Sequence, residues 1–175
     1  DMPGIGGSPD PVLPYNAITM SRTASLLMDQ FGYDMVDVMG VSWGGAMAQN
    51  FAMQYPARVR RAILAATSPG WMMVPGKLSA LSKMANPRRY IDPDYMTRNF
   101  ETLYGGALTG SSGHVSRLKP PSGTGYLYQL FAMLGWTSAP LLPFLMKAET
   151  LILMGGDDNI VPVANGRLLA TLIPQ

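Results

Sequence analysis

The chain has 175 residues, 47% of them hydrophobic and 14% charged, which is enough for one globular domain with a real core and excludes a disordered tail. The absence of cysteine excludes disulfides and thiolate metal sites, and a net charge of +2 is too small to argue for a nucleic-acid partner. No apolar run reaches about 18 residues, so no transmembrane segment is expected.

The first 67 residues alternate between helical and strand patterns. Residues 1–11 are loop material, rich in glycine and proline. A helix is expected from the N-cap Asn16 to Gly32, with Ile18, Met20, Leu26, Leu27 and Phe31 as its buried stripe. A buried strand at 35–41, a helix ending at Tyr55 before Pro56, and a second strand at 61–67 follow. Short connections in this order predict a parallel sheet.

The pattern changes after residue 68. Residues 69–148 show helical pieces between glycine-rich and proline-rich turns, without an obvious strand. The strand pattern resumes in "ETLILMGGDD", and a loop and a short helix complete the chain. We therefore expect an α/β fold with a mostly parallel sheet and helices on both faces. Residues 1–68 and 149–175 form the core, and residues 69–148 form an inserted, mainly helical lid.

The stretch "GVSWG", residues 40–44, fits the pattern G-x-S-x-G between a strand and a helix. Such a turn strains the serine backbone and exposes its Oγ above the sheet, with small residues on either side where strand and helix approach. Ser42 is thus a candidate nucleophile, and the backbone N–H of Trp43 a candidate donor to an oxyanion. The alternative is a tight strand-to-helix turn in which the serine only caps the helix.

The stretch "LILMGGDDNIVP", residues 151–162, offers an acid at the end of a later strand. Asp158, four residues before Pro162, is the preferred candidate, and Asp157 is its competitor. The alternative is that both aspartates only cap the end of the strand, as Asp and Gly often do.

The expected order of a catalytic triad in this fold is serine, acid, histidine. The one histidine, His114, lies between Ser42 and Asp158, in the insert, and no histidine follows Asp158. The chain also opens in a loop, and three strands would leave much apolar surface bare. We therefore expect this chain to be a piece of a longer protein, with core segments missing at both ends.

These residues resemble an α/β-hydrolase, through "DMPGIGGS", "GVSWGG", "YPARVRRAIL" and "GGDDNIVP". Within that superfamily the chain resembles the intracellular depolymerases of medium-chain poly(3-hydroxyalkanoates). The closer likeness lies in the lid, in "MVPGK", "NPRRYI", "YGG" and above all "YLYQLFAMLGWTS". The resemblance covers essentially the whole chain.

The resemblance implies a serine esterase that cleaves the stored polyester to 3-hydroxy acids through an acyl-enzyme, with no cofactor and no metal. Ser42 matches the nucleophile and Asp158 the acid, whereas the family's histidine would fall beyond Gln175 and its second oxyanion donor before Asp1. One departure is Asn159, where the family pattern has proline. We expect this change to loosen the acid loop without removing the carboxylate.

The lid is expected to bind an apolar polymer chain, and the implied location is the cytoplasm, at the surface of polyester granules. Aromatic and methionine side chains could form the binding surface; the candidates are Trp71, Met72, Met73, Tyr126, Tyr128, Phe131 and Trp136. The alternative for each of them is packing within the lid's own small core.

Two other functions fit the same residues. One is a different α/β-hydrolase, such as a lipase, a short-chain esterase or a carbon–carbon bond hydrolase acting on a small apolar substrate. The other is a non-enzymatic binding protein on the same fold, which gains weight only if the protein truly lacks a catalytic histidine.

A prediction follows for His114. A glycine- and serine-rich lid stretch could not hold an imidazole to within about 0.5 Å of a productive position. In the full-length protein, His114→Ala should therefore leave nitrophenyl ester hydrolysis within about tenfold of the parent rate, a barrier change of at most about 1.4 kcal/mol. A loss as large as that of Ser42→Ala would contradict both the fragment expectation and the role given to a later histidine.

Overall fold

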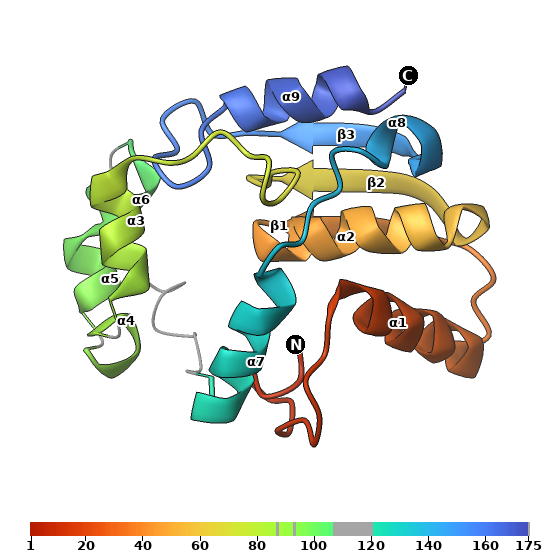
Figure 1. Ribbon diagram of the computed structural model, residues 1–175, viewed down its shortest axis with the longest axis horizontal. Helices are drawn as coiled ribbons and strands as arrows, with labels where there is room; N and C mark the ends of the chain where they lie inside the picture. The colour runs from red at the N-terminus through yellow and green to blue at the C-terminus, as the bar shows by residue number, and fades with distance from the viewer. Residues whose placement is uncertain (87, 93, 107–120, 175) are drawn as a thin grey trace.

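The computed structural model describes residues 1–86, 88–92, 94–106 and 121–174. Its sheet has three parallel strands in the order β1 (Val36–Val41), β2 (Val59–Ala65) and β3 (Glu149–Leu153). The expected strands at 35–41 and 61–67 are thus confirmed, the second with its start two residues earlier. Because all three strands run the same way, their carboxyl ends meet at one edge of the sheet (Figure 1).

Helices alternate with the strands along the chain (Figure 1). They are α1 (Ala17–Phe31), α2 (Trp43–Gln54), the 3₁₀ turn η1 (Pro56–Arg58), α3 (Leu78–Ala85), α4 (Arg88–Ile91), α5 (Tyr95–Arg98), α6 (Phe100–Tyr104), α7 (Gly123–Met133), α8 (Leu142–Leu145) and α9 (Ala164–Leu172). Helices α3–α6 gather beyond the carboxyl ends of the strands, and α7 lies near the start of α2 (Figure 1). No helix in the described ranges has the length and apolar character that crossing a membrane requires.

The caps of α1 follow the sequence expectation, but its buried face does not. Asn16 caps the helix through a hydrogen bond from Thr19 N to its Oδ1, 2.9 Å, and Gly32 ends it at a φ of 73°. The expected stripe is wrong, because Ile18, Leu26, Leu27 and Phe31 are more than half exposed. The buried residues are instead Ala17, Ser21, Ser25 and Met28.

Small side chains on that face allow α1 to approach α2 closely. Asn50 of α2 donates from Nδ2 to Ser21 Oγ, 2.9 Å, and to the carbonyl of Ala17, 3.2 Å. Arg58 donates from Nη1 to Ser25 Oγ, 2.8 Å. The polar groups on both sides are therefore paired. These hydrogen bonds offset the cost of burying serine hydroxyls, so a face made of serines can be buried here.

The main core lies on one face of the sheet. Residues of α1, α2, β2, α8, β3 and α9 meet there; they include Met28, Phe51, Ala52, Leu64, Leu142, Met146, Leu169 and Ile173. On the opposite face, Met39, Val41, Leu151 and Leu153 are each 46–64% exposed. In the part of the chain that the structure describes, helices thus cover one face of the sheet, where the sequence led us to expect both.

Buried polar contacts tie the insert to this core. Gln49 of α2, fully buried, accepts a hydrogen bond from Ser138 Oγ, 2.6 Å, and donates to the carbonyl of Ser68, 3.1 Å. Asn165 of α9, also fully buried, bonds both the N–H and the carbonyl of Val74, each at 2.8 Å. These amides fix where the insert leaves the core and where it returns.

The Gln49 contact generates a stability prediction. In the full-length protein, Gln49→Ala would leave the buried Ser138 hydroxyl and Ser68 carbonyl without partners, which should lower the free energy of unfolding by about 2–4 kcal/mol. Thr171→Ala on the exposed face of α9 is the control and should change it by about 0.5 kcal/mol or less. Urea unfolding measures both, and similar values for the two variants would contradict the anchoring role.

Candidate active site

Ser42 lies at the turn between β1 and α2 in a strained backbone conformation, with φ at 53° and ψ at −119°. Its N–H donates to the carbonyl of Ala65, 2.9 Å, and its own carbonyl accepts from Thr67 Oγ1, 2.7 Å. The residue is exposed and its side chain makes no capping hydrogen bond to α2. The expected strained strand-to-helix turn is confirmed, and a serine that serves only as a helix cap is not what the structure shows.

The two glycines of the motif are not equivalent. A Cβ on Gly40 would lie 2.1 Å from the carbonyl oxygen of Gly44, so β1 and α2 approach too closely for any side chain there. A Cβ on Gly44 itself would meet nothing within 4 Å. The close approach on the helix side falls instead at Gly45, whose Cβ would lie 2.5 Å from Thr67 Cβ. The expectation of a steric need on both sides is therefore right for Gly40 and wrong for Gly44.

Trp43 is the first residue of α2, so its backbone N–H is one of the free donors at the positive end of that helix. Its ring packs edge-to-face on Trp136, with ring centroids 6.1 Å apart and planes at 84°. Its Nε1 is buried without a hydrogen-bond partner in the described part of the chain. The site thus has a backbone N–H donor beside Ser42, and the packed rings of Trp43 and Trp136 lie next to that donor.

The acid loop, residues 154–162, follows β3 and lies at the same edge of the sheet as Ser42. Val41, Ala65 and Leu153 are in register across the three strands, so the turns after β1 and β3 leave the sheet at the same level. One carboxylate oxygen of Asp158, Oδ1, accepts from the N–H groups of Ile160, 2.8 Å, and Val161, 2.9 Å.

Asp157, the competitor, is exposed. A Cβ on Gly105 would lie 2.0 Å from its carbonyl oxygen, so the backbone of Asp157 is pressed against the end of α6. Asp158 is the less exposed of the two and has its carboxylate held by two backbone donors. These contacts distinguish Asp158 from Asp157 as the carboxylate that backbone donors orient, and they also fit an aspartate that caps the turn, so its role as the acid stays a prediction.

Tyr104, the last residue of α6, is a neighbour of this site that the sequence reasoning missed. Tyr104 is 40% exposed, but partial desolvation still raises the pKa of its hydroxyl; the positive charge of Arg89 lowers this pKa, and the negative charge of Asp158 raises it further. Its only signal in the sequence was its place before Gly105 and Gly106 in "YGG". The insert thus contributes a phenol whose electrostatic surroundings include the candidate acid.

Trp136 is the lid candidate that the structure brings to the turn. Besides the ring contact with Trp43, its Nε1 donates to Asn50 Oδ1 on α2, 3.2 Å, and its carbonyl accepts from Trp71 N, 2.8 Å. The Trp71 side chain is 76% exposed, and Met73 is half-buried with its sulfur accepting from Ser68 Oγ, 3.5 Å. Trp136 therefore packs into the structure, whereas Trp71 leaves its apolar surface open.

Of the remaining lid candidates, Tyr126, Tyr128 and Phe131 lie on α7, and Met72 follows Trp71 in the segment before α3. Tyr126 is half-buried, with the Arg89 guanidinium 5.7 Å from its ring centroid, and Phe131 is more than half exposed. Met72 is exposed and Tyr128 half-buried. His114 lies outside the described residues, so its separation from Ser42 stays a prediction.

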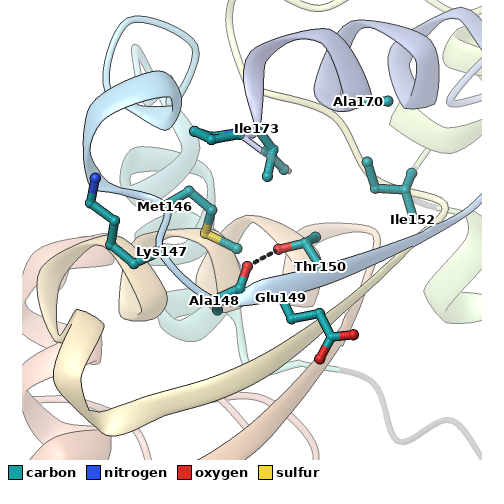
Figure 2. A pocket seen from close by; sticks show the side chains of 9 residues that line it. Met146, Lys147, Ala148, Glu149, Thr150, Ile152, Ala170 and Ile173 are labelled. Atoms are coloured by element: carbon teal, nitrogen blue, oxygen red, sulfur yellow. Dashed lines mark hydrogen bonds between the residues drawn. The ribbon is translucent and has the colours of Figure 1, made fainter.

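A cavity of about 730 Å³ lies elsewhere, between the start of β3 and the end of α9 (Figure 2). Its walls are mostly aliphatic and include Met146, Ile152 and Ile173; its charged residues are Lys147 and Glu149. Glu149 opens β3, so this hollow is at the opposite end of the strand from the acid loop. It offers no serine or histidine and is not the candidate site. Within the described ranges, no three acidic or histidine side chains are placed to hold a metal.

Comparison with known proteins agrees with the parallel sheet and the strained strand-to-helix turn described above. Residues 1–105 match the family model described as the alpha/beta hydrolase fold. The chain belongs to the α/β-hydrolase family. An esterase from Exiguobacterium antarcticum superposes with a TM-score of 0.77 at 21% identity, covering 99% of this chain and 68% of the esterase.

Among relatives of this α/β-hydrolase, a poly(3-hydroxyalkanoate) depolymerase from Ectopseudomonas oleovorans is 44% identical over 179 aligned residues. The match covers all of this chain and 63% of the depolymerase. A 2-hydroxy-6-oxo-6-phenylhexa-2,4-dienoate hydrolase from Burkholderia cepacia is 28% identical, again over all of this chain and 65% of the relative. The chain thus spans a little under two thirds of these two relatives, and the resemblance to the depolymerases is supported over the whole chain.

The glycine contacts generate a prediction for this α/β-hydrolase. In the full-length protein, Gly40→Ala should lower the free energy of unfolding by about 1–3 kcal/mol, because the strand and helix must separate. The motif alone would rank Gly44→Ala as equally damaging, but the open space there should make that variant neutral or stabilising by up to about 1 kcal/mol. Thermal or urea unfolding separates the two, and equal destabilisation would contradict the packing described here.

Proposed function

We propose that the protein to which this chain belongs is a serine hydrolase that cleaves ester bonds of poly(3-hydroxyalkanoate). The observation that carries the proposal is Ser42, exposed at a φ of 53° between a strand and the positive end of a helix. That arrangement presents a hydroxyl to a substrate at a place where negative charge is stabilised. The 44% identity to a depolymerase supports the choice of polyester among ester substrates.

The proposed mechanism is acyl transfer. Ser42 Oγ attacks the ester carbonyl while a histidine takes its proton, and the backbone N–H of Trp43 donates to the tetrahedral oxyanion. Collapse of that intermediate breaks the C–O bond, and the histidine returns the proton to the departing alcohol. Water then releases the acyl group from Ser42 as a 3-hydroxy acid. Asp158 orients the imidazole, which the resemblance to the depolymerases assigns to a histidine outside residues 1–175.

We propose that the expected lid, residues 69–148, covers this site and binds the polymer through its part before α8, since Leu142 and Met146 pack in the main core. Support comes from the apolar surface that the described part of the insert leaves open, which includes Trp71, Met72, Leu127, Phe131 and Leu134. Side chains that pack in a lid's own core would be buried, whereas these are 49–76% exposed. Large exposed apolar patches mark contact surfaces. A cytoplasmic location at the granule surface is part of the same proposal.

A second candidate is hydrolysis of a carbon–carbon bond in a small dienoate. It is favoured by sequence similarity to the B. cepacia dienoate hydrolase, 28% identical, and to two hydrolases from Comamonas testosteroni, 28% and 26% identical. The nucleophile and acid would be the same residues. The preference for the polyester rests on the higher identity to the depolymerase along the whole chain.

The catalytic role of Ser42 is tested by Ser42→Ala in the full-length protein. Loss of the nucleophile should lower the turnover of a nitrophenyl ester by a factor of about 10⁴ or more, with thermal stability unchanged or increased. Ser82→Ala, an exposed serine of α3, is the matched control and should keep the parent rate. Retention of most activity in Ser42→Ala would overturn the proposal.

The same enzyme preparation separates the two substrate classes. Purified medium-chain polyester granules, a nitrophenyl ester and 2-hydroxy-6-oxo-6-phenylhexa-2,4-dienoate are supplied in parallel, and released 3-hydroxy acids, nitrophenol or benzoate are measured. Release of 3-hydroxy acids from granules, abolished by Ser42→Ala, is the expected result. Turnover of the dienoate with no action on granules would establish the second candidate instead.

A further inference from the structure

The acid loop is tied to the insert by the side chain of Asn159. Its Nδ2 donates to the carbonyl oxygens of Thr102, 3.1 Å, and Glu101, 3.3 Å. Both carbonyls belong to α6, a helix of five residues. The Glu101 carbonyl also accepts from Gly105 N, 3.0 Å, whereas the Thr102 carbonyl is among the last of the helix, which have no partner further along it. The Asn159 amide therefore supplies to the Thr102 carbonyl the donor that a longer helix would have supplied.

The backbone of the same loop is clamped on its other side by the segment that enters α3. Lys77 N donates to the carbonyl of Asn159, 2.8 Å. A Cβ on Gly76 would lie 2.3 Å from the carbonyl oxygen of Ile160, so only glycine allows this approach. Ile160 also packs against the small buried cluster of the insert formed by Tyr95, Met96 and Leu103.

Asp158 lies between these contacts. Asp157 before it is pressed against Gly105, which has a φ of 69°, and Asn159 after it bonds to α6. The two N–H groups that hold Asp158 Oδ1 belong to the residues directly after Asn159. Any shift of the Asn159 backbone would therefore move the donors that set the direction of the carboxylate.

We propose that Asn159 is a positioning residue that couples the docking of the insert to the orientation of the Asp158 carboxylate. The inference rests on the proposed function, because it takes Asp158 as the catalytic acid. Where the family pattern has proline, which fixes φ and carries no donor, this chain fixes the loop with two hydrogen bonds to α6. The sequence-based expectation that Asn159 loosens the loop relative to proline stays untested, and the observed amide contacts tie the loop to α6.

The test is Asn159→Ala in the full-length protein, with a soluble nitrophenyl ester too small to need the polymer-binding surface. The expected result is a fall in kcat of about tenfold with KM changed by less than about twofold, because the loss acts on the transition state through Asp158. Asn99→Ala is the matched control. The Asn99 side chain donates to the carbonyl of Tyr95, 2.8 Å, and accepts from Lys83 Nζ. It thus lies in the same part of the insert but bonds to insert residues instead of the acid loop, and its removal should leave kcat within about twofold.

A double-mutant cycle distinguishes positioning from general loosening. If Asn159 acts through Asp158, Asn159→Ala should have no further effect on kcat in an Asp158→Ala background. An unchanged kcat in the single variant, or a tenfold loss that persists without Asp158, would overturn the proposal. Circular dichroism and thermal unfolding check the fold. If the alanine variant does not fold, Asn159→Ser, which keeps a smaller donor, replaces it, and its kcat is expected to lie between the parent value and a tenfold loss. Full activity in Ser42→Ala or Asp158→Ala would instead refute the proposed function itself.

Discussion

The close approach of β1 and α2 is the constraint on which the rest of the site depends. With Gly40 against the carbonyl of Gly44, the chain must turn from strand to helix within one residue, and Ser42 takes the positive φ that this turn requires. A strained conformation lasts only if its surroundings hold it, and two hydrogen bonds to the end of β2 do so through Ala65 and Thr67. The packing that strains Ser42 also places it at the start of α2, where backbone donors converge.

The insert is joined to this core by polar contacts as well as by apolar packing. Gln49 and Asn165 lie fully buried and bond to the segments by which the insert leaves and rejoins the core, at Ser68, Val74 and Ser138. Such contacts are costly to break one at a time, since each broken contact leaves a buried polar group without a partner. They give the insert a defined position over the carboxyl edge of the sheet, where Trp136 meets Trp43 and α6 meets the acid loop.

Local signals in the sequence were enough for the order of the elements and for the candidate nucleophile. The caps Asn16 and Gly32, the proline after Tyr55 and the alternation of apolar runs act within a few residues, so they can be recognised without a structure. The turn at Ser42 belongs to the same class, because its requirement for glycine at position 40 is a contact between residues four apart.

Contacts between distant segments could not be predicted in this way. The buried face of α1 depends on partners in α2 and at Arg58, and this is why serines rather than Leu26 and Phe31 are buried there. The proximity of Tyr104 to Asp158 and the hydrogen bonds of Asn159 to α6 join segments more than 50 residues apart in the chain, and a single sequence carries no signal for such a pairing. Trp136 was already a candidate from the sequence, whereas the contacts of Tyr104 and Asn159 around the acid loop could be found only in the structure.

The central claim, that the strained Ser42 is an activated nucleophile, is tested most directly by covalent trapping. The full-length protein would be incubated with a fluorophosphonate, which reacts with serines whose proton is taken by a neighbouring base, and then digested and analysed by mass spectrometry. The account predicts one phosphonyl group per chain, located on the peptide that contains Ser42, and loss of ester hydrolysis in step with labelling. An active protein whose Ser42 peptide stays unmodified, or which carries the label on another residue, would contradict it.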